Sequence, residues 1–331
     1  MLPDRLLVDL PNWVGDVVMS LPAVARLVAA NADGETVLHA RPPVERLLAE
    51  LFPAVRVVVT RKGESPFAVA RKLRSDTGRF GVGVTLRHAG RAKLLLRLTA
   101  RRSLGSMGEG GRLLLSDPVA VDRERHQVHD ADPILERLGL PPADPGWRPE
   151  LSGALREEGR VALAAVGAGG PVVGLAPSAA WGESKRWPVE RFGELAARLA
   201  GRGFVPVVLI GPGEEGVAAE VRAASGGELP ALGSSLDVAG LAGLMSHLAA
   251  VVANDSGPMH LAALAGCPVV GLFGPTDPRR TAPLGPRSAV VSRGLDCAPC
   301  FEPVCPLGTQ ACLREIGVDE VLGRVLGLLE A

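Results

Sequence analysis

The chain has 331 residues, of which 47% are hydrophobic and 22% charged, so we expect about two globular domains and no extended disorder. Its 36 basic and 36 acidic residues cancel, which argues against a dedicated nucleic-acid-binding protein. No apolar run reaches the roughly 18 residues that a membrane span needs. No signal peptide is visible at the N-terminus, so we expect a cytoplasmic location.

Charge is distributed unevenly along the chain. Residues 56–102, called the basic block below, contain 13 Lys and Arg residues against Glu64 and Asp76. The block therefore carries +11 in a chain whose net charge is zero. Such a block is either a solvated face or a surface for an anionic partner.

The first half alternates short apolar runs with helical patterns, which predicts a parallel α/β sheet. Strands are expected at residues 6–8, 37–38, 55–59 and 82–84. Helices are expected at residues 17–30, 44–51, 66–74, 91–98 and about 126–138. The Pro- and Gly-rich run 141–146 then interrupts the pattern, and we place the domain boundary near residue 150.

The second half repeats the pattern. Strands are expected at residues 172–176, 204–210, 251–252 and 268–273. Helices are expected at residues 189–200, 214–224, 237–249 (capped by Ser234 or Ser235), 258–265 and 318–329. We therefore expect two α/β domains, 1–150 and 151–331, with the ligand at the carboxyl ends of the strands in the cleft between them.

The first candidate segment is residues 11–16, directly after the first strand. Gly15 permits a tight turn, and Asp16 opens a helix as an N-cap would. Asp16 is either a plain capping residue or a carboxylate that acts as a base. This segment contains no GxGxxG pattern, so a dinucleotide site in this domain is not expected.

The second candidate segment, residues 176–188, follows the first strand of the second domain. Lys185 is the only lysine of this half. A loop of small residues followed by Lys185 and Arg186 at a strand end suits a phosphate group. The alternative is a surface pair that flanks the start of a helix.

The third candidate segment is residues 253–260, where a strand turns into a helix with Pro258 at the first helical position. The amides and dipole of that helix end suit a phosphate. Asp255 would repel a phosphate, so we assign it to sugar hydroxyls. His260 lies one turn into the helix and either faces the same site or is an ordinary helical histidine.

Four motifs occur together in one order. They are Gly15-Asp16, Lys185-Arg186-Trp187-Pro188, Asn254-Asp255-Ser256-Gly257-Pro258-Met259-His260 and Phe273-Gly274-Pro275-Thr276-Asp277-Pro278. Their combination and separations resemble glycosyltransferase family 9, the ADP-heptose:lipopolysaccharide heptosyltransferases, and look closest to the heptosyltransferase II type.

The resemblance implies a GT-B fold, with two Rossmann-like doubly wound domains facing across a cleft. It places the acceptor on the N-terminal domain and the nucleotide sugar on the C-terminal domain. It also implies an inverting, metal-independent enzyme with no cofactor, for which ADP-heptose is a substrate. The partners implied are the ADP-sugar donor, a phosphorylated lipid A–core acceptor and the inner leaflet of the cytoplasmic membrane, where the enzyme would be peripheral.

The resemblance also assigns roles to single residues. Asp16 matches the proposed catalytic base, and Lys185 matches the lysine that meets the diphosphate. An acidic residue after the strand at 207–210 would bind ribose, and Glu215 or Glu214 is the candidate. Ser178 is the only hydroxyl at its end of the 176–180 loop. The donor loop corresponds to Asp255, Ser256, Gly257 and His260.

Four cysteines have the spacing C-x2-C-x4-C-x6-C, namely Cys297, Cys300, Cys305 and Cys312. Four thiols this close could hold zinc or an iron–sulfur cluster, although the spacing is not that of a zinc ribbon. We assign no metal here, and reduced or regulatory thiols are the alternative. Cys267 lies in an apolar turn and is expected to be buried.

Three other functions stay open from the sequence. The first two are a different nucleotide-sugar transferase of the same fold and a sugar-nucleotide 2-epimerase. An epimerase needs no acceptor and gives no reason for the basic block. The third is a non-catalytic nucleotide-sugar-binding module, which would not need Asp16.

Overall fold

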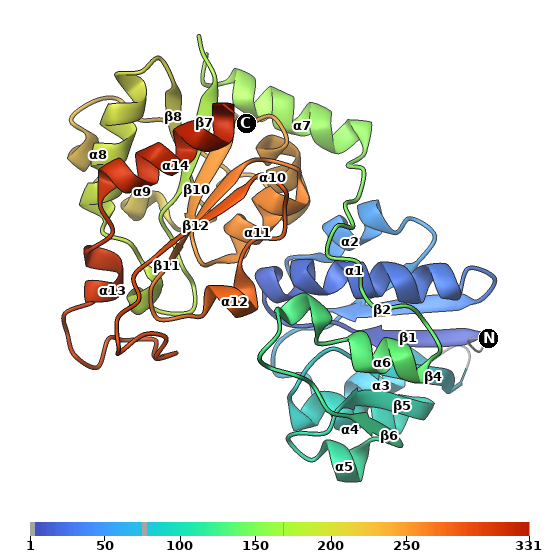
Figure 1. Ribbon diagram of the computed structural model, residues 1–331. Helices are drawn as coiled ribbons and strands as arrows, with labels where there is room; N and C mark the ends of the chain where they lie inside the picture. The colour runs from blue at the N-terminus through green and yellow to red at the C-terminus, as the bar shows by residue number, and fades with distance from the viewer. Residues whose placement is uncertain (1–3, 75–77, 168, 331) are drawn as a thin grey trace. The chain divides into compact units, whose positions relative to one another are not determined.

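The computed structural model describes residues 4–74, 78–167 and 169–330 of the chain. The chain divides into two compact units, Met1–Trp147 and Arg148–Ala331, close to the boundary expected near residue 150 (Figure 1). None of the helices in the described ranges combines the length and the apolar character required to cross a membrane.

The first unit is built on a parallel sheet with the strand order β3-β2-β1-β4-β5-β6. Its central strands, β1 and β4, are mostly apolar and buried except at one residue each, as expected for a sheet covered on both faces. The strands are β1 (Arg5–Asp9), β2 (Glu35–Ala40), β3 (Arg56–Val59), β4 (Phe80–Thr85), β5 (Ala100–Ser106) and β6 (Asp117–Val119).

Helices connect these strands, and Figure 1 shows the long α1 running along one face of the sheet. The single helix expected at 126–138 is wrong, because His126 caps a short η1 and a separate α6 begins at Asp132, with Pro133 as its second residue. The helices are α1 (Val14–Ala30), α2 (Glu45–Leu51), α3 (Pro66–Arg74), α4 (Gly90–Thr99), α5 (Gly111–Leu114), η1 (Gln127–His129) and α6 (Asp132–Arg137).

The second unit is built on another six-stranded parallel sheet, ordered β12-β11-β10-β7-β8-β9. Its strands are β7 (Val172–Ala176), β8 (Val205–Leu209), β9 (Ala231–Leu232), β10 (Ala250–Asn254), β11 (Val269–Phe273) and β12 (Ser288–Ser292). Three of them, β7, β10 and β11, are buried along their whole length.

Helices on this sheet surround a core that contains Trp187 and Phe192, which meet edge to face. The indole of Trp187 donates a hydrogen bond to the Ile316 carbonyl at 3.1 Å and so ties the candidate loop to the C-terminal segment. The helices are α7 (Gly153–Ala164), η2 (Glu183–Lys185), α8 (Val189–Ala200), α9 (Glu215–Ser225), α10 (Val238–Met245), α11 (Gly257–Leu264), α12 (Pro278–Thr281), α13 (Ala311–Arg314) and α14 (Val318–Glu330).

Two details of helix starts differ from the expectations. Asp237, and not Ser234 or Ser235, caps α10 by accepting a hydrogen bond from the Gly240 amide at 2.8 Å. Helix α11 begins at Gly257 behind Ser256, so Pro258 is its second residue.

Both sheets have the same order when each is counted from its own first strand. The order reverses between β1 and β4 in the first unit and between β7 and β10 in the second. In open α/β sheets ligands bind outside the carboxyl ends of the strands at such a reversal. The two-domain α/β fold predicted from the sequence is confirmed, and each unit has one such edge.

Candidate active site

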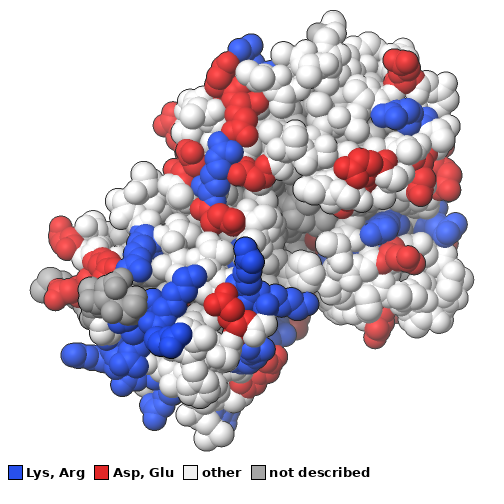
Figure 2. Space-filling view, turned by 180° about the vertical axis from the view of Figure 1, so that it is seen from behind, with Lys and Arg blue, Asp and Glu red and all other residues white. Residues whose placement is uncertain are grey.

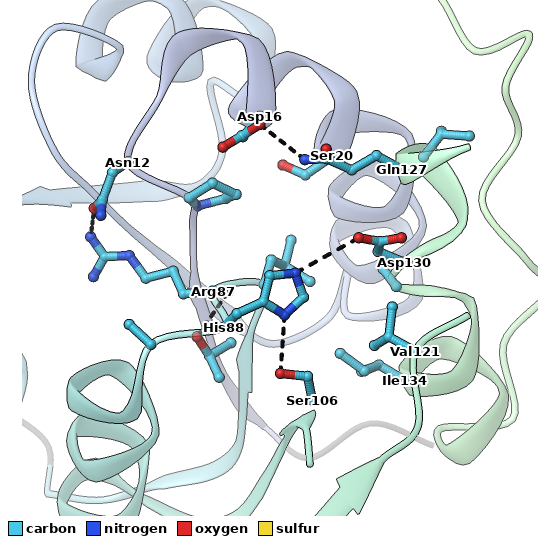
Figure 3. A pocket seen from close by; sticks show the side chains of 16 residues that line it. Asn12, Asp16, Ser20, Arg87, His88, Ser106, Val121, Gln127, Asp130 and Ile134 are labelled. Atoms are coloured by element: carbon cyan, nitrogen blue, oxygen red, sulfur yellow. Dashed lines mark hydrogen bonds and ion pairs between the residues drawn. The ribbon is translucent and has the colours of Figure 1, made fainter. Parts of the chain in front are cut away.

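A cavity of about 160 Å³ lies at the carboxyl ends of the strands in the first unit (Figure 3). It is lined by the loops that follow β1 and β4, by the first turns of α1, by the end of β5 and by the segment around η1. Its polar lining consists of Asn12, Asp16, Ser20, Thr85, Arg87, His88, Ser106, Gln127 and Asp130. This position matches the expected ligand edge of the sheet.

Asp16 lies in the first turn of α1, two residues after the helix begins, and therefore is not the N-cap that the sequence suggested; Trp13 holds that place. A carboxylate in the first turn is stabilised by the helix dipole. Gln127 donates a hydrogen bond from Nε2 to Asp16 Oδ1 at 3.0 Å, as Figure 3 shows. The structure thus holds the Asp16 carboxylate at the cavity.

Sequence reasoning missed Gln127 and His88. His88 extends between Ser106, whose Oγ lies 3.1 Å from Nδ1, and Asp130, whose Oδ2 lies 3.8 Å from Nε2 (Figure 3). These residues come from segments that lie up to 111 positions away from Asp16 in the chain. No local motif marks them, so only the fold could bring them to this cavity.

In the second unit, Lys185 lies at the end of η2, and 15% of its side chain is exposed. Its Nζ is 2.7 Å from Asp255 Oδ2 and 3.3 Å from the Asp255 carbonyl oxygen. The Trp181 ring lies 5.1 Å from the same ammonium group. A lysine has three N–H donors, and these two contacts leave one of them for a ligand.

Asp255 is the centre of this cluster and is almost fully buried. Besides Lys185, its Oδ2 accepts a hydrogen bond from Thr276 at 2.7 Å, and its Oδ1 lies 3.9 Å from His260 Nε2. The structure therefore brings together the predicted residues Lys185, Asp255 and His260. The sequence assigned Asp255 to sugar hydroxyls, whereas here its carboxylate is engaged by Lys185 and Thr276.

Asn254 fixes the loops on either side of this cluster. Its buried side chain accepts a hydrogen bond from the Trp187 amide at 3.0 Å and donates one to the Pro177 carbonyl at 2.7 Å. The second candidate segment (residues 176–188) and the third (residues 253–260) are thereby joined at the end of β10 (Ala250–Asn254).

Ser256 is the N-cap of α11, but its side chain makes no cap hydrogen bond to the helix. Its Oγ donates instead to the Asn254 carbonyl at 3.0 Å. The first amides of α11, from Gly257 onward, therefore receive no side-chain acceptor from the cap residue and suit an anion. Ser178 Oγ, at the end of β7, is also buried without a hydrogen-bond partner among the residues described.

The two ribose candidates differ in conformation. Glu214 precedes α9 and folds back on its own loop, where Oε2 accepts a hydrogen bond from the Gly211 amide at 2.8 Å. Glu215 is the first residue of α9 and is exposed. In the described part of the chain, no hydrogen bond or ion pair joins either glutamate to the Lys185–Asp255 pair.

The four clustered cysteines line one small cavity in the segment after β12. The amide of Gln310 donates a hydrogen bond to Cys305 Sγ and lowers the pKa of that thiol. Burial, together with the other three thiols, raises the pKa of Cys312. Across the described ranges, no group of three or more His, Cys, Asp or Glu side chains is arranged to hold a metal ion.

Cys267 is buried, as expected, and burial raises its pKa to about 12.

The model of glycosyltransferase family 9 (heptosyltransferase) matches residues 67–311. The chain belongs to this family. Among curated glycosyltransferase relatives, the lipooligosaccharide heptosyltransferase 2 of Campylobacter jejuni is 24% identical and covers 98% of both chains. The corresponding Haemophilus influenzae protein is 26% identical over 87% of this chain and 88% of its own.

Solved structures of family 9 glycosyltransferases share the fold. Heptosyltransferase II of Escherichia coli superimposes with a TM-score of 0.80 at 24% identity, covering 98% of each chain. A family 9 glycosyltransferase of Veillonella parvula superimposes with a TM-score of 0.87 at 21% identity, covering 100% of this chain and 98% of its own. The family and fold inferred from the sequence motifs are therefore confirmed.

Proposed function

We propose that this family 9 glycosyltransferase moves a heptose from ADP-heptose to the inner core of lipopolysaccharide, with inversion at the anomeric carbon. The proposal is supported by relatives named heptosyltransferase 2 that span almost the whole chain. It is carried by one geometric observation: the Asp16 carboxylate faces a cavity at the ligand edge of the first sheet, held by Gln127.

The reaction assigned to this geometry is a single displacement. An acceptor hydroxyl oxygen attacks the anomeric carbon of the heptose, and the bond from that carbon to the ADP oxygen breaks. Asp16 takes the proton of the attacking hydroxyl, and ADP leaves with the electron pair. A sugar hydroxyl is a poor nucleophile, so a carboxylate that accepts its proton accelerates the attack.

The charge that develops on ADP would be stabilised in the second unit. Lys185 offers its remaining N–H, the amides at Ser256 and Gly257 offer backbone donors, and the buried Ser178 hydroxyl adjoins the same strand ends. Asp255 holds the lysine in position through its 2.7 Å ion pair. In this proposal these donors act without a metal ion, and Glu215 or Glu214 would meet the ribose.

The acceptor domain assigned here is the first unit, which contains the basic block. Figure 2 shows a group of Lys and Arg side chains gathered on one side of this unit. We propose that this surface meets anionic head groups at the inner face of the cytoplasmic membrane. Lys93 does not belong to the surface, because it is fully buried and donates a hydrogen bond to the Gly108 carbonyl.

The test is turnover of purified protein with a heptose-deficient lipopolysaccharide core as acceptor and a panel of nucleotide sugars. We expect release of ADP from ADP-heptose, dependent on the acceptor and lost in Asp16→Asn. Transfer from a different nucleotide sugar would replace the donor assignment. Donor binding without turnover in the wild-type protein would favour the non-catalytic alternative.

A further inference from the structure

A second group of charged side chains lies beside the Asp16 cavity and takes no part in the chemistry proposed above. It occupies the carboxyl edge of the first sheet, where the strand order reverses at β1. Asp9 ends β1, Arg41 follows β2 directly, and Arg87 follows β4 by two residues. Because β1 lies between β2 and β4, the two arginines flank the end of β1.

Arg87 is held rigidly in this group. Only 9% of its side chain is exposed; Nη1 lies 3.2 Å from Asp9 Oδ1, and Nη2 donates to Asn12 Oδ1 (Figure 3). Asp9 is itself fully buried and also accepts hydrogen bonds from the side chains of Thr85 and His39. The Nε of Arg87 is buried without a hydrogen-bond partner among the described residues.

Arg41 is half-buried, and no hydrogen bond or ion pair of its side chain is found among the described residues. Its Nε is buried without a partner. Burial lowers the pKa of Arg41, and the positive charges of Arg87 and Arg91 lower it further, against the opposing effect of Asp9 and Glu64. A partly desolvated cation beside other cations is unfavourable unless an anion compensates it.

We propose that Arg41 and Arg87 form a subsite for an oxyanion, a phosphate or carboxylate group carried by the acceptor. The proposal rests on the function proposed above and names the acceptor group that this edge recognises. Guanidinium groups present planar forks of donors that match phosphate and carboxylate oxygens.

Arg87 and Asp16 line the same cavity, and Arg41 follows the neighbouring strand at the same edge of the sheet. In the proposal, an acceptor whose hydroxyl lies at Asp16 extends past Arg87 and places its anion between the two arginines.

The variant for testing is Arg41→Gln, because Arg41 supports no other side chain of the described structure. Arg26→Gln is the matched control, since Arg26 is an exposed arginine of α1 in the same unit. Arg41→Lys keeps the positive charge but removes the planar pair of guanidinium donors. Substitution of Arg87 is less suitable, because it would leave Asp9 buried without its cation.

The first measurement is steady-state transfer to a phosphorylated acceptor and to the same acceptor after phosphatase treatment. Loss of a charge-assisted contact typically weakens binding about tenfold or more. We expect Arg41→Gln to raise the KM for the phosphorylated acceptor by about that factor, with kcat and ADP affinity unchanged. Equal KM values for Arg41→Gln and Arg26→Gln, or a loss of ADP affinity, would overturn the proposal.

The second measurement separates the subsite from the proposed function. Calorimetry with glucose 1-phosphate and with glucuronate, without donor, distinguishes a phosphate from a carboxylate preference. We expect wild type and Arg26→Gln to bind one of these anions and Arg41→Gln to lose that binding. Arginine-dependent binding in a protein without heptose transfer would refute the function and keep the subsite. Heptose transfer without such binding would refute the subsite alone.

Discussion

The carboxyl edges of the two sheets share a topology but differ in chemistry. In the first unit the edge buries an aspartate, Asp9, that is surrounded by hydrogen-bond donors, and it opens into the cavity with Asp16. In the second unit the buried residue at the matching reversal is a neutral amide, Asn254, and the next residue is engaged in the Lys185–Asp255 ion pair. The shared strand order therefore places a candidate binding site at the same edge of both sheets. The residues that follow each strand give the two sites different chemical properties.

Because of this difference, we propose different roles for the two edges in the transfer reaction. In the proposed reaction the first edge provides the carboxylate that accepts the proton of the acceptor hydroxyl, so loss of Asp16 should affect the chemical step. In the same proposal the second edge provides a cation and backbone amides for the diphosphate, so loss of Lys185 should affect donor binding as well as departure of ADP. Substitutions at the two edges should therefore give different kinetic signatures.

The largest effect is expected at the first edge. Asp16→Asn keeps the size of the side chain but removes the proton acceptor, and loss of a general base typically lowers the rate about 10²–10⁴-fold. Donor affinity should stay within a few-fold of wild type, which calorimetry with ADP would check. Near-wild-type turnover in this variant would remove Asp16 from the mechanism and with it the contrast between the edges.

The second edge should respond in binding. Lys185→Ala removes a charge-assisted contact worth about 1.5–3 kcal/mol, so ADP should bind about tenfold more weakly or worse. The change also leaves Asp255 buried without its cation, so a melting curve must accompany the measurement. Lys185→Arg is the control that restores the charge. If ADP binds Lys185→Ala as tightly as wild type, Lys185 does not contact the diphosphate.

A smaller effect is expected from substitutions in the basic block, which lies in the first unit only. Neutralising three exposed arginines of the basic block, Arg71, Arg97 and Arg101, should raise the KM for a lipid acceptor in vesicles. Each well-placed basic residue contributes about 1 kcal/mol at an anionic membrane, and salt screens it over roughly 8–10 Å. High salt should mimic the triple variant, and the KM for ADP-heptose should change less. An acceptor KM insensitive to both treatments would leave the block as a solvated face.

The smallest effect is expected from a chelator. The proposed leaving-group stabilisation uses Lys185 and backbone amides, so EDTA should leave turnover unchanged. The measurement is activity before and after prolonged dialysis against EDTA, with elemental analysis of the protein. A loss of activity that zinc or iron restores would contradict metal-independent transfer and direct attention to the cavity of Cys297, Cys300, Cys305 and Cys312.

Strand and helix predictions succeeded where burial imposes a pattern and failed where it does not. The apolar runs of β1, β4, β7 and β11 were predictable because strands buried on both faces are continuously hydrophobic. Strand β5 (Ala100–Ser106) was missed, because two exposed arginines follow its first residue and the rest contains serine and glycine. Its place in the sheet depends on pairing with β4, which no local pattern shows.

The candidate site shows the same division. Asp16, Lys185, Asp255 and His260 belong to short motifs that follow strands and contain Gly or Pro, and these motifs could be recognised in the sequence. Their contacts were not visible. The Lys185–Asp255 ion pair joins residues 70 positions apart.

By itself the sequence determined the two α/β units and the family and pointed to the candidate loops, because periodic burial and strand-end motifs are local properties of the chain. Only the tertiary structure decided which side chains meet at those loops. Gln127 holds Asp16 across 111 positions, and Arg41 and Arg87 flank Asp9 because β2 and β4 pair with β1. Such encounters are set by sheet order and register, through which distant residues reach one edge, and no spacing along the chain records them.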